Sequence, residues 1–130
     1  MSSWSGNNTP ASPSAYKLNG SNDFASIPDS PQFDLLNFTV AAFVKISGDA
    51  SSHRRIISQQ DAANYWLLHI ENNRLETWLS LDGINGVSYG PFLNDDKWHF
   101  IAITRDVNLD KVTFWVDGVN VGSAATASNV

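Results

Sequence analysis

Residues 112–122 read VTFWVDGVNVG, and this stretch decides the fold class. An alternating strand, Val112–Val116, is followed by the turn Asp117-Gly118 and a return strand, Val119–Val121. Asp-Gly tolerates the positive φ angles of a tight two-residue hairpin, so we expect the two strands to pair antiparallel. A further strand is predicted just upstream, at Lys97–Arg105, which begins KWHFIA. Two-faced strands joined by such turns favour a β-sandwich.

Turn signals recur along the rest of the chain at the spacing that is typical of an all-β sandwich. A short hairpin is predicted between Ala15–Asn19 and Phe24–Ile27, around a Gly20-Ser21-Asn22-Asp23 turn. A longer strand is predicted at Phe38–Ile46, and a shorter one at Arg54–Gln59. On the first of these, one face is predicted to hold Phe38, Val40, Ala42, Val44 and Ile46.

Two interpretations compete for the segment from Tyr65 to Leu81. Asp61 is placed to cap a helix that would run through Trp66 and Ile70. Against the helix, Asn72-Asn73 separates two runs of matched length with period-two alternation, which suits a hairpin turn. We favour two strands, Tyr65–Glu71 and Arg74–Leu81.

Length and composition indicate one folded domain. The chain has 130 residues, of which 12% are aromatic and 16% charged; this is enough to bury one core and argues against disorder. Residues 1–14 are rich in Ser, Asn, Pro and Gly and are expected to form a flexible lead-in to a domain at 15–130.

Charge and cysteine content exclude several classes of partner and site. The net charge of -5 comes from scattered acids, and the sequence has no basic run, so we expect neither nucleic acid nor an anionic membrane as a partner. Cysteine is absent, which removes disulfides, thiolate metal sites and cysteine nucleophiles. The sequence also shows no apolar run of membrane-spanning length and no classical secretory signal peptide.

Five segments, taken in order, resemble the laminin-G-like family of concanavalin A-type jelly rolls, in its bacterial and phage-associated form. They are Tyr16–Asp29, Phe38–Lys45, Arg55–Asp61, Trp98–Ala102 and Phe114–Gly118. The resemblance implies a two-sheet antiparallel jelly-roll sandwich that recognises glycans or proteins. It also implies an extracellular, cell-surface or virion location.

The end of the sequence departs from the family pattern. Family members continue with one or two further strands and an Asp-Glu pair, whereas this sequence ends at Val130. We therefore expect the last strand or strands of the jelly roll to be lacking, which would expose an unpaired sheet edge. Two explanations stay open. Either a strand-donating partner, a second copy of the chain or the N-terminal segment fills the gap, or the sequence is a trimmed one.

Strand alternation sorts the side chains onto two faces. The positions expected in the core are Val112, Phe114, Val116, Leu75, Leu79, Leu81, Trp98 and Phe100. The positions expected on the opposite face are Thr113, Trp115, Arg74, Glu76, Trp78, His99, Ile103, Tyr65, Leu67, His69 and Glu71. If these strands share one sheet, its outer surface carries a group of aromatic and polar residues: Trp78, Trp115, Tyr65 and His69, beside Glu76 and Arg74.

Three interpretations of this group stay open. Aromatic rings flanked by hydrogen-bonding groups suit sugars, the same residue types supply most of the binding energy in protein interfaces, and a loop or the lead-in would also cover such rings. The leading prediction is a non-catalytic recognition module that binds carbohydrate or a cell-surface glycan. The alternative is a structural or adhesive component of a larger assembly, such as a phage capsid or tail decoration protein.

The resemblance also implies that calcium is a candidate cofactor at the rim of a sheet. Loop oxygens of Asn22, Asp23 and Asp61 are the candidate ligands, although Asn and Asp are also common in turns for conformational reasons. Catalysis is not expected, because Glu71 and Glu76 are separated by a turn, unlike the closely alternating acids of jelly-roll glucanases. The three histidines, at positions 53, 69 and 99, show no metal-ligand spacing along the sequence.

Overall fold

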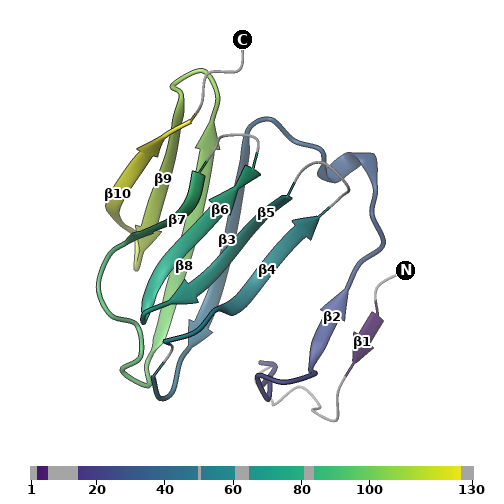
Figure 1. The fold of residues 1–130 in the computed structure, drawn as a ribbon, viewed down its shortest axis with the longest axis vertical. Helices are drawn as coiled ribbons and strands as arrows, with labels where there is room; N and C mark the ends of the chain where they lie inside the picture. Colours follow the sequence, from purple (N-terminus) through teal and green to yellow (C-terminus); the bar gives the residue numbers. More distant parts are fainter. Residues whose placement is uncertain (1–2, 6–14, 50, 61–64, 81–83, 127–130) are drawn as a thin grey trace. The chain divides into compact units, whose positions relative to one another are not determined.

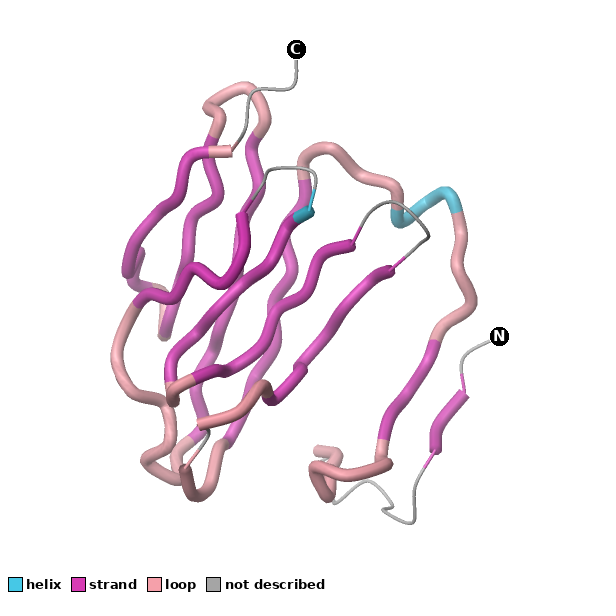
Figure 2. Tube along the Cα trace, in the orientation of Figure 1, coloured by secondary structure: helices cyan, strands magenta, loops and turns pink. Residues whose placement is uncertain are grey.

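The computed structural model describes residues 3–5, 15–49, 51–60, 65–80 and 84–126. Strands account for nearly all of the regular structure (Figure 2). The chain forms two compact units, residues 1–35 and 36–130. Among the described residues, no helix is long enough and apolar enough to cross a bilayer.

In its described residues, 3–5 and 15–35, the first unit contains two short strands and one 3-10 turn. Strand β1 (Ser3–Ser5) pairs antiparallel with β2 (Phe24–Ser26), and the turn η1 spans Pro31–Phe33. The predicted hairpin between Ala15–Asn19 and Phe24–Ile27 is therefore wrong. The reason lies in the turn itself, where the Asn19 side-chain oxygen accepts hydrogen bonds from the backbone N–H groups of residues 21, 22 and 23. This side-chain bonding replaces the backbone pairing of a hairpin.

The second unit is a sandwich of two antiparallel four-stranded sheets, which lie one over the other in Figure 1. One sheet has the order β10-β9-β8-β3 and the other the order β4-β5-β6-β7. The predicted all-β, two-sheet antiparallel sandwich is confirmed. The strands are β3 (Phe38–Lys45), β4 (Arg54–Gln60), β5 (Tyr65–Glu71), β6 (Arg74–Leu79), β7 (Ile84–Tyr89), β8 (Trp98–Asp106), β9 (Lys111–Val116) and β10 (Val119–Ala125).

Two tight turns set the register of the strands that they join. Asp117 and Gly118 have φ angles of 51° and 80°, and β9 and β10 pair across them as predicted. Asn72 and Asn73 have φ angles of 49° and 63°, and β5 and β6 pair across them. Two consecutive positive φ angles give the turn a twist that matches the twist of the strands. The hairpin interpretation of residues 65–79 is confirmed, and the helix is excluded.

The core fills the space between the two sheets. It includes residues that were predicted there: Val112, Phe114 and Val116 of β9 and Leu75 and Leu79 of β6. Val44 of β3 and Ile46 just after it are also buried, so the predicted inward face of this segment is confirmed. Leu81 lies outside the described residues. The buried apolar residues of the core are Val44, Ile46, Leu68, Ile70, Leu75, Leu79, Ile84, Leu93, Ile101, Ile103, Val112, Phe114 and Val116.

Strand β8 faces the opposite way from the prediction. Ile101 and Ile103 are fully buried, whereas Trp98 is 55% exposed and Phe100 packs against exposed Phe43 with ring centroids 5.2 Å apart. Trp98 and Phe100 are therefore wrong as core residues, and Ile103 is wrong as a surface residue. The register with β3 explains this result: Phe43 and Lys45, on its outward face, lie opposite Phe100 and Trp98.

Candidate functional site

The candidate site lies on the outer face of the β4-β5-β6-β7 sheet, which points away from the core. Alternation along β5 places Tyr65, Leu67, His69 and Glu71 on this face, because Leu68 and Ile70 point into the core. The Asn72-Asn73 turn then fixes which β6 residues lie opposite them. His69 lies opposite Glu76, Leu67 opposite Trp78, and Glu71 opposite Arg74.

His69 is the centre of the site and is fully buried. Its Nε2 lies 3.2 Å from Glu76 Oε1 and 3.5 Å from Glu71 Oε2, so one nitrogen faces two carboxylates. Among the described residues, its Nδ1 has no hydrogen-bond partner. Burial lowers the pKa of His69 below its ordinary value, although the charges of Glu76 and Glu71 act in the opposite direction. Burial therefore favours the neutral form of the imidazole.

Glu76 is held in place by several donors. Besides its contact with His69, Oε1 accepts a hydrogen bond from Trp78 Nε1 at 2.9 Å, and Oε2 accepts one from Ser88 Oγ. Burial alone would raise the pKa of Glu76, but hydrogen bonds, led by those from Ser88 and Trp78, outweigh it and hold the pKa below its ordinary value. The carboxylate is ionised, and it fixes the indole ring of Trp78.

Gly86 on β7 leaves the space that this arrangement needs. Its φ of +66° is in the left-handed region, and a Cβ there would lie 3.1 Å from Glu76 Oε1 and 3.4 Å from Trp78 Nε1. Any side chain would therefore press on the hydrogen bond between the carboxylate and the indole. Both its conformation and its size therefore favour glycine here.

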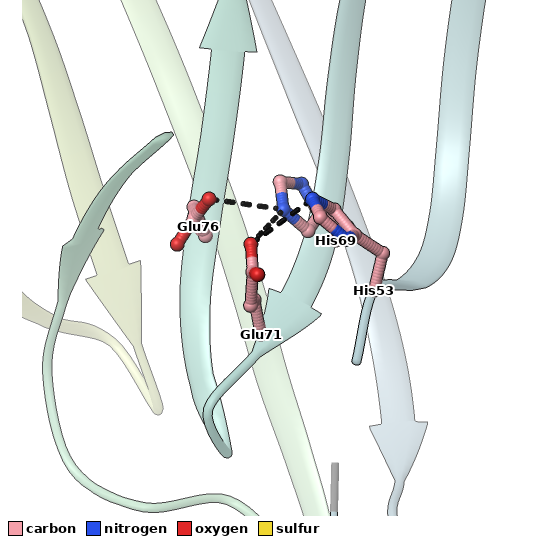
Figure 3. Close-up of side chains that lie close together, drawn as sticks. All are labelled: His53, His69, Glu71 and Glu76. Atoms are coloured by element: carbon pink, nitrogen blue, oxygen red, sulfur yellow. Dashed lines mark hydrogen bonds and ion pairs between the residues drawn. The ribbon is translucent and has the colours of Figure 1, made fainter. Parts of the chain in front are cut away.

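His53, in the segment before β4, completes a group that we call the His/Glu cluster: His53, His69, Glu71 and Glu76. His53 Nε2 lies 3.1 Å from Glu71 Oε2, and its ring stacks on His69 with centroids 4.9 Å apart and an interplanar angle of 20°. The four side chains point toward one another (Figure 3). One potential ligand atom from each lies within 4.8 Å of the others.

Two aromatic rings lie beside the His/Glu cluster. The Trp78 and Tyr65 rings are half-buried, with centroids 6.5 Å apart. The Trp78 ring also meets two histidine rings edge-on, with centroid-to-centroid distances of 5.7 Å to His53 and 6.2 Å to His69. Tyr65, His69, Glu76 and Trp78 were expected together, and the structure brings all four together on one face.

The sequence matches the family described as the concanavalin A-like lectin/glucanases superfamily over residues 19–130. The chain belongs to this superfamily. Among solved structures, domains LG4-5 of the mouse laminin alpha1 chain are similar, with a TM-score of 0.57 and 23% identity over 71% of this chain and 24% of that chain. The laminin-G-like jelly roll is therefore confirmed as a fold. No curated protein matches the sequence.

Trp115 of this concanavalin A-like domain does not lie on the face that carries Trp78. Strand β9 pairs with β8 and β10, whereas β6 pairs with β5 and β7. Trp115 is thus on the other sheet, where its Nε1 donates a hydrogen bond to Thr104 Oγ1 at 3.2 Å. The prediction that one sheet face carries both indoles is wrong.

Arg74 lies at the rim of the same sheet face as Glu76. It is exposed, and its guanidinium lies over the Phe92 ring at 4.7 Å from the centroid, which is a cation–π contact. It therefore borders the site rather than forming its centre.

Two of the predicted calcium ligands, Asn22 and Asp23, belong to the first unit. Asn22 Oδ1 accepts a hydrogen bond from Asn19 Nδ2, and Asp23 Oδ2 accepts one from the Asn19 backbone N–H. These bonds account for both residues through turn chemistry. Asp61 lies outside the described residues, so calcium binding there stays a prediction.

Two members of the His/Glu cluster, His53 and Glu71, were not among the predicted binding residues. Counting outward from a two-residue Asn72-Asn73 turn places Glu76 opposite His69, and alternation places Glu71 on the same face, so three of the four members had a signal in the sequence. His53 had none, because it reaches the site through the pairing of β4 with β5.

Proposed function

We propose that this domain is a non-catalytic recognition module that binds a carbohydrate or cell-surface glycan on the outer face of the β4-β5-β6-β7 sheet. The observation that carries the proposal is the pair of half-buried rings, Trp78 and Tyr65, beside ionisable groups. Laminin-G-like domains are in general non-catalytic binding modules. We also propose an extracellular, cell-surface or virion location.

The geometry suits a sugar ring that lies over the indole. The C–H face of a sugar stacks on an aromatic ring, while its hydroxyl groups form hydrogen bonds with neighbouring polar atoms. Glu71 and His53 can reach such hydroxyls, because their side chains are 21% and 47% exposed. His69 and Glu76 are buried, so their role is to position Trp78.

The protonation state of Glu76 supports a binding role over hydrolysis. A glycosidase needs one carboxyl group whose raised pKa lets it donate a proton to the leaving oxygen. The pKa of Glu76 is held below its ordinary value instead, mainly through hydrogen bonds from Ser88 and Trp78 that overcome the effect of burial. An ionised, fully hydrogen-bonded carboxylate makes a poor general acid.

The test is a glycan array with the purified protein, followed by calorimetry on the best glycan, with and without a chelator. We expect Trp78→Ala to weaken binding at least about fivefold, since stacking on an aromatic ring contributes roughly 1 kcal/mol or more. Trp115→Ala is the matched control, because its indole lies on the other sheet, and it should bind as the wild type does. An array without any bound glycan, or loss of binding in Trp115→Ala alone, would overturn the proposal.

A second candidate function is a structural or adhesive role in a larger assembly, such as a phage capsid or tail decoration protein. The outer face of the β10-β9-β8-β3 sheet favours it, because Phe43 is 70% and Trp98 is 55% exposed there. Exposed aromatic side chains in a group are typical of protein contacts. The contact would be with a second copy of the chain or with a strand-donating partner.

Solution mass distinguishes this second role. We expect sedimentation to show an oligomer that Phe43→Ser and Trp98→Ser together convert to a monomer. A wild-type monomer throughout the accessible concentration range counts against the homo-oligomer.

A further inference from the structure

We propose that the His/Glu cluster binds one divalent transition-metal ion of the zinc class. The ligands are one imidazole nitrogen from each of His53 and His69 and one carboxylate oxygen from each of Glu71 and Glu76. The inference does not depend on glycan binding, because it stands on the cluster alone (Figure 3).

Three of the distances between the donor atoms are close to those that such an ion requires. A tetrahedral ion with bonds of about 2.0–2.1 Å separates its ligand atoms by about 3.3–3.4 Å. His53 Nε2 lies 3.1 Å from Glu71 Oε2, and His69 Nε2 lies 3.2 Å from Glu76 Oε1 and 3.5 Å from Glu71 Oε2. The remaining pairs are at most 4.8 Å apart. Partly exposed His53 and Glu71 have the freedom to close these wider edges.

The charges in the cluster are unbalanced without a cation. Two carboxylates face the same nitrogen of His69, and a single imidazole nitrogen carries at most one proton for both of them. Across the described residues, neither Glu71 nor Glu76 forms an ion pair with lysine or arginine. Placing two carboxylates together at a buried imidazole is costly, and a dication would offset that cost.

The ligand set indicates which class of ion fits. Two imidazoles with two carboxylates suit zinc and the neighbouring transition metals. Calcium prefers six to eight oxygen ligands, and magnesium prefers an octahedral set of oxygens. We therefore expect selectivity for zinc over calcium and magnesium.

The second shell limits the expected affinity. A metal-bound imidazole usually donates its other N–H to an acceptor, and loss of such a partner weakens binding by on the order of 10- to 100-fold. Within the described residues, His69 Nδ1 has no such acceptor. We expect binding that is weaker than in structural zinc sites by about that factor.

The test is calorimetric titration of untagged, chelator-treated protein with zinc sulfate. We expect one zinc ion per chain, and no binding of calcium or magnesium at the same concentrations. His53→Ala and Glu71→Gln should each weaken zinc binding at least about tenfold. Because both side chains are partly exposed, both variants should fold, which far-UV circular dichroism verifies.

His99→Gln is the matched control. It removes a histidine that also contacts two carboxylates, Asp95 and Asp117, but through opposite ring nitrogens. This variant should bind zinc as the wild type does. Wild-type affinity in His53→Ala, zinc binding lost in His99→Gln, or no zinc binding by the wild type would each overturn the proposal.

Discussion

Two histidines of this domain each contact two carboxylates, yet the two arrangements are built differently. At His69, both carboxylates face the same nitrogen, Nε2. At His99, Nδ1 lies 2.8 Å from Asp117 Oδ2 and Nε2 lies 2.9 Å from Asp95 Oδ1, so the ring bridges two acceptors on opposite sides. Convergence creates a point where several ligand atoms meet, whereas bridging connects two segments of chain.

The surroundings of the two rings also drive their pKa values apart. Burial lowers the pKa of His69, whereas hydrogen bonds to Asp117 and Asp95 raise the pKa of His99. The environment of the first ring favours its neutral form, and that of the second favours its charged form. The same residue types therefore serve different purposes, depending on solvent access and on which nitrogen faces the acid.

The largest expected effect comes from removing the buried acid. Glu76→Ala leaves Trp78 and Ser88 without their acceptor and leaves His69 Nε2 with only its longer contact to Glu71, and unsatisfied donors that are shielded from water cost about 1–3 kcal/mol each. The contact that His69 keeps with Glu71 offsets part of this cost, so we expect a loss of about 2–4 kcal/mol in the free energy of unfolding. Urea denaturation measures it.

The corresponding change at the second histidine should be much milder. Asp95→Ala removes an exposed acceptor of His99, and water replaces it. Equal losses in Glu76→Ala and Asp95→Ala would show that burial does not distinguish the two arrangements.

A smaller effect is expected from two glycines, one beside each arrangement. Gly86 and Gly118 both have positive φ, at +66° and +80°, so alanine at either position costs about 1–2 kcal/mol in backbone strain. A Cβ at Gly118 meets nothing within 4 Å, whereas one at Gly86 presses on Glu76 and Trp78. We expect Gly86→Ala to lose roughly 1 kcal/mol more than Gly118→Ala in thermal unfolding. Equal losses would mean that the indole moves aside freely.

The smallest effect is a pH dependence at His99. The pKa of His99 is raised in the folded state, so its contribution to stability is complete below about pH 6.5 and is lost as the pH rises through the folded value. The pKa values of Asp95 and Asp117 are lowered, mainly by hydrogen bonds from His99, so their contribution is lost as the pH falls below about 4. Lys97, 4.0 Å from Asp95, adds a second positive charge.

These directions define a window for the measurement. The stability difference between the wild type and His99→Gln should be largest between about pH 4 and 6.5 and should shrink by about pH 8.5. Solvent screening keeps it small, because Asp95 and Asp117 are 41% and 52% exposed. Chemical denaturation at several pH values measures it, and a difference that stays constant with pH would contradict the charged bridge.

Local signals predicted the parts of the fold that depend on local chemistry. Asp117-Gly118 and Asn72-Asn73 adopt the positive φ angles that their composition predicts, so both hairpins could be found from the sequence. The sequence did not show which side of β8 points into the core. Its run from Trp98 to Ile103 is apolar at nearly every position, so alternation alone does not show which side is buried, and pairing with β3 decides it.

The candidate site was likewise predictable only where its residues are linked by a short turn. His69 and Glu76 are linked through one short turn, whereas Trp78 and Trp115 were expected together because nothing local assigns a strand to one of two sheets. His53 was missed for a related reason. Its place beside Glu71 depends on how β4 packs along β5, a contact between segments separated by a loop.

The Asn72-Asn73 turn also restricts how natural variation can alter this surface. Side chains on a strand alternate strictly, so a single residue inserted at the turn that shifts β6 by one position would transfer Glu76 and Trp78 to the interior and Leu75 to the exterior. Length changes are therefore tolerated poorly at this bend. Related sequences should accumulate their insertions in other connections and keep exactly two residues between His69-Ile70-Glu71 and Arg74-Leu75-Glu76.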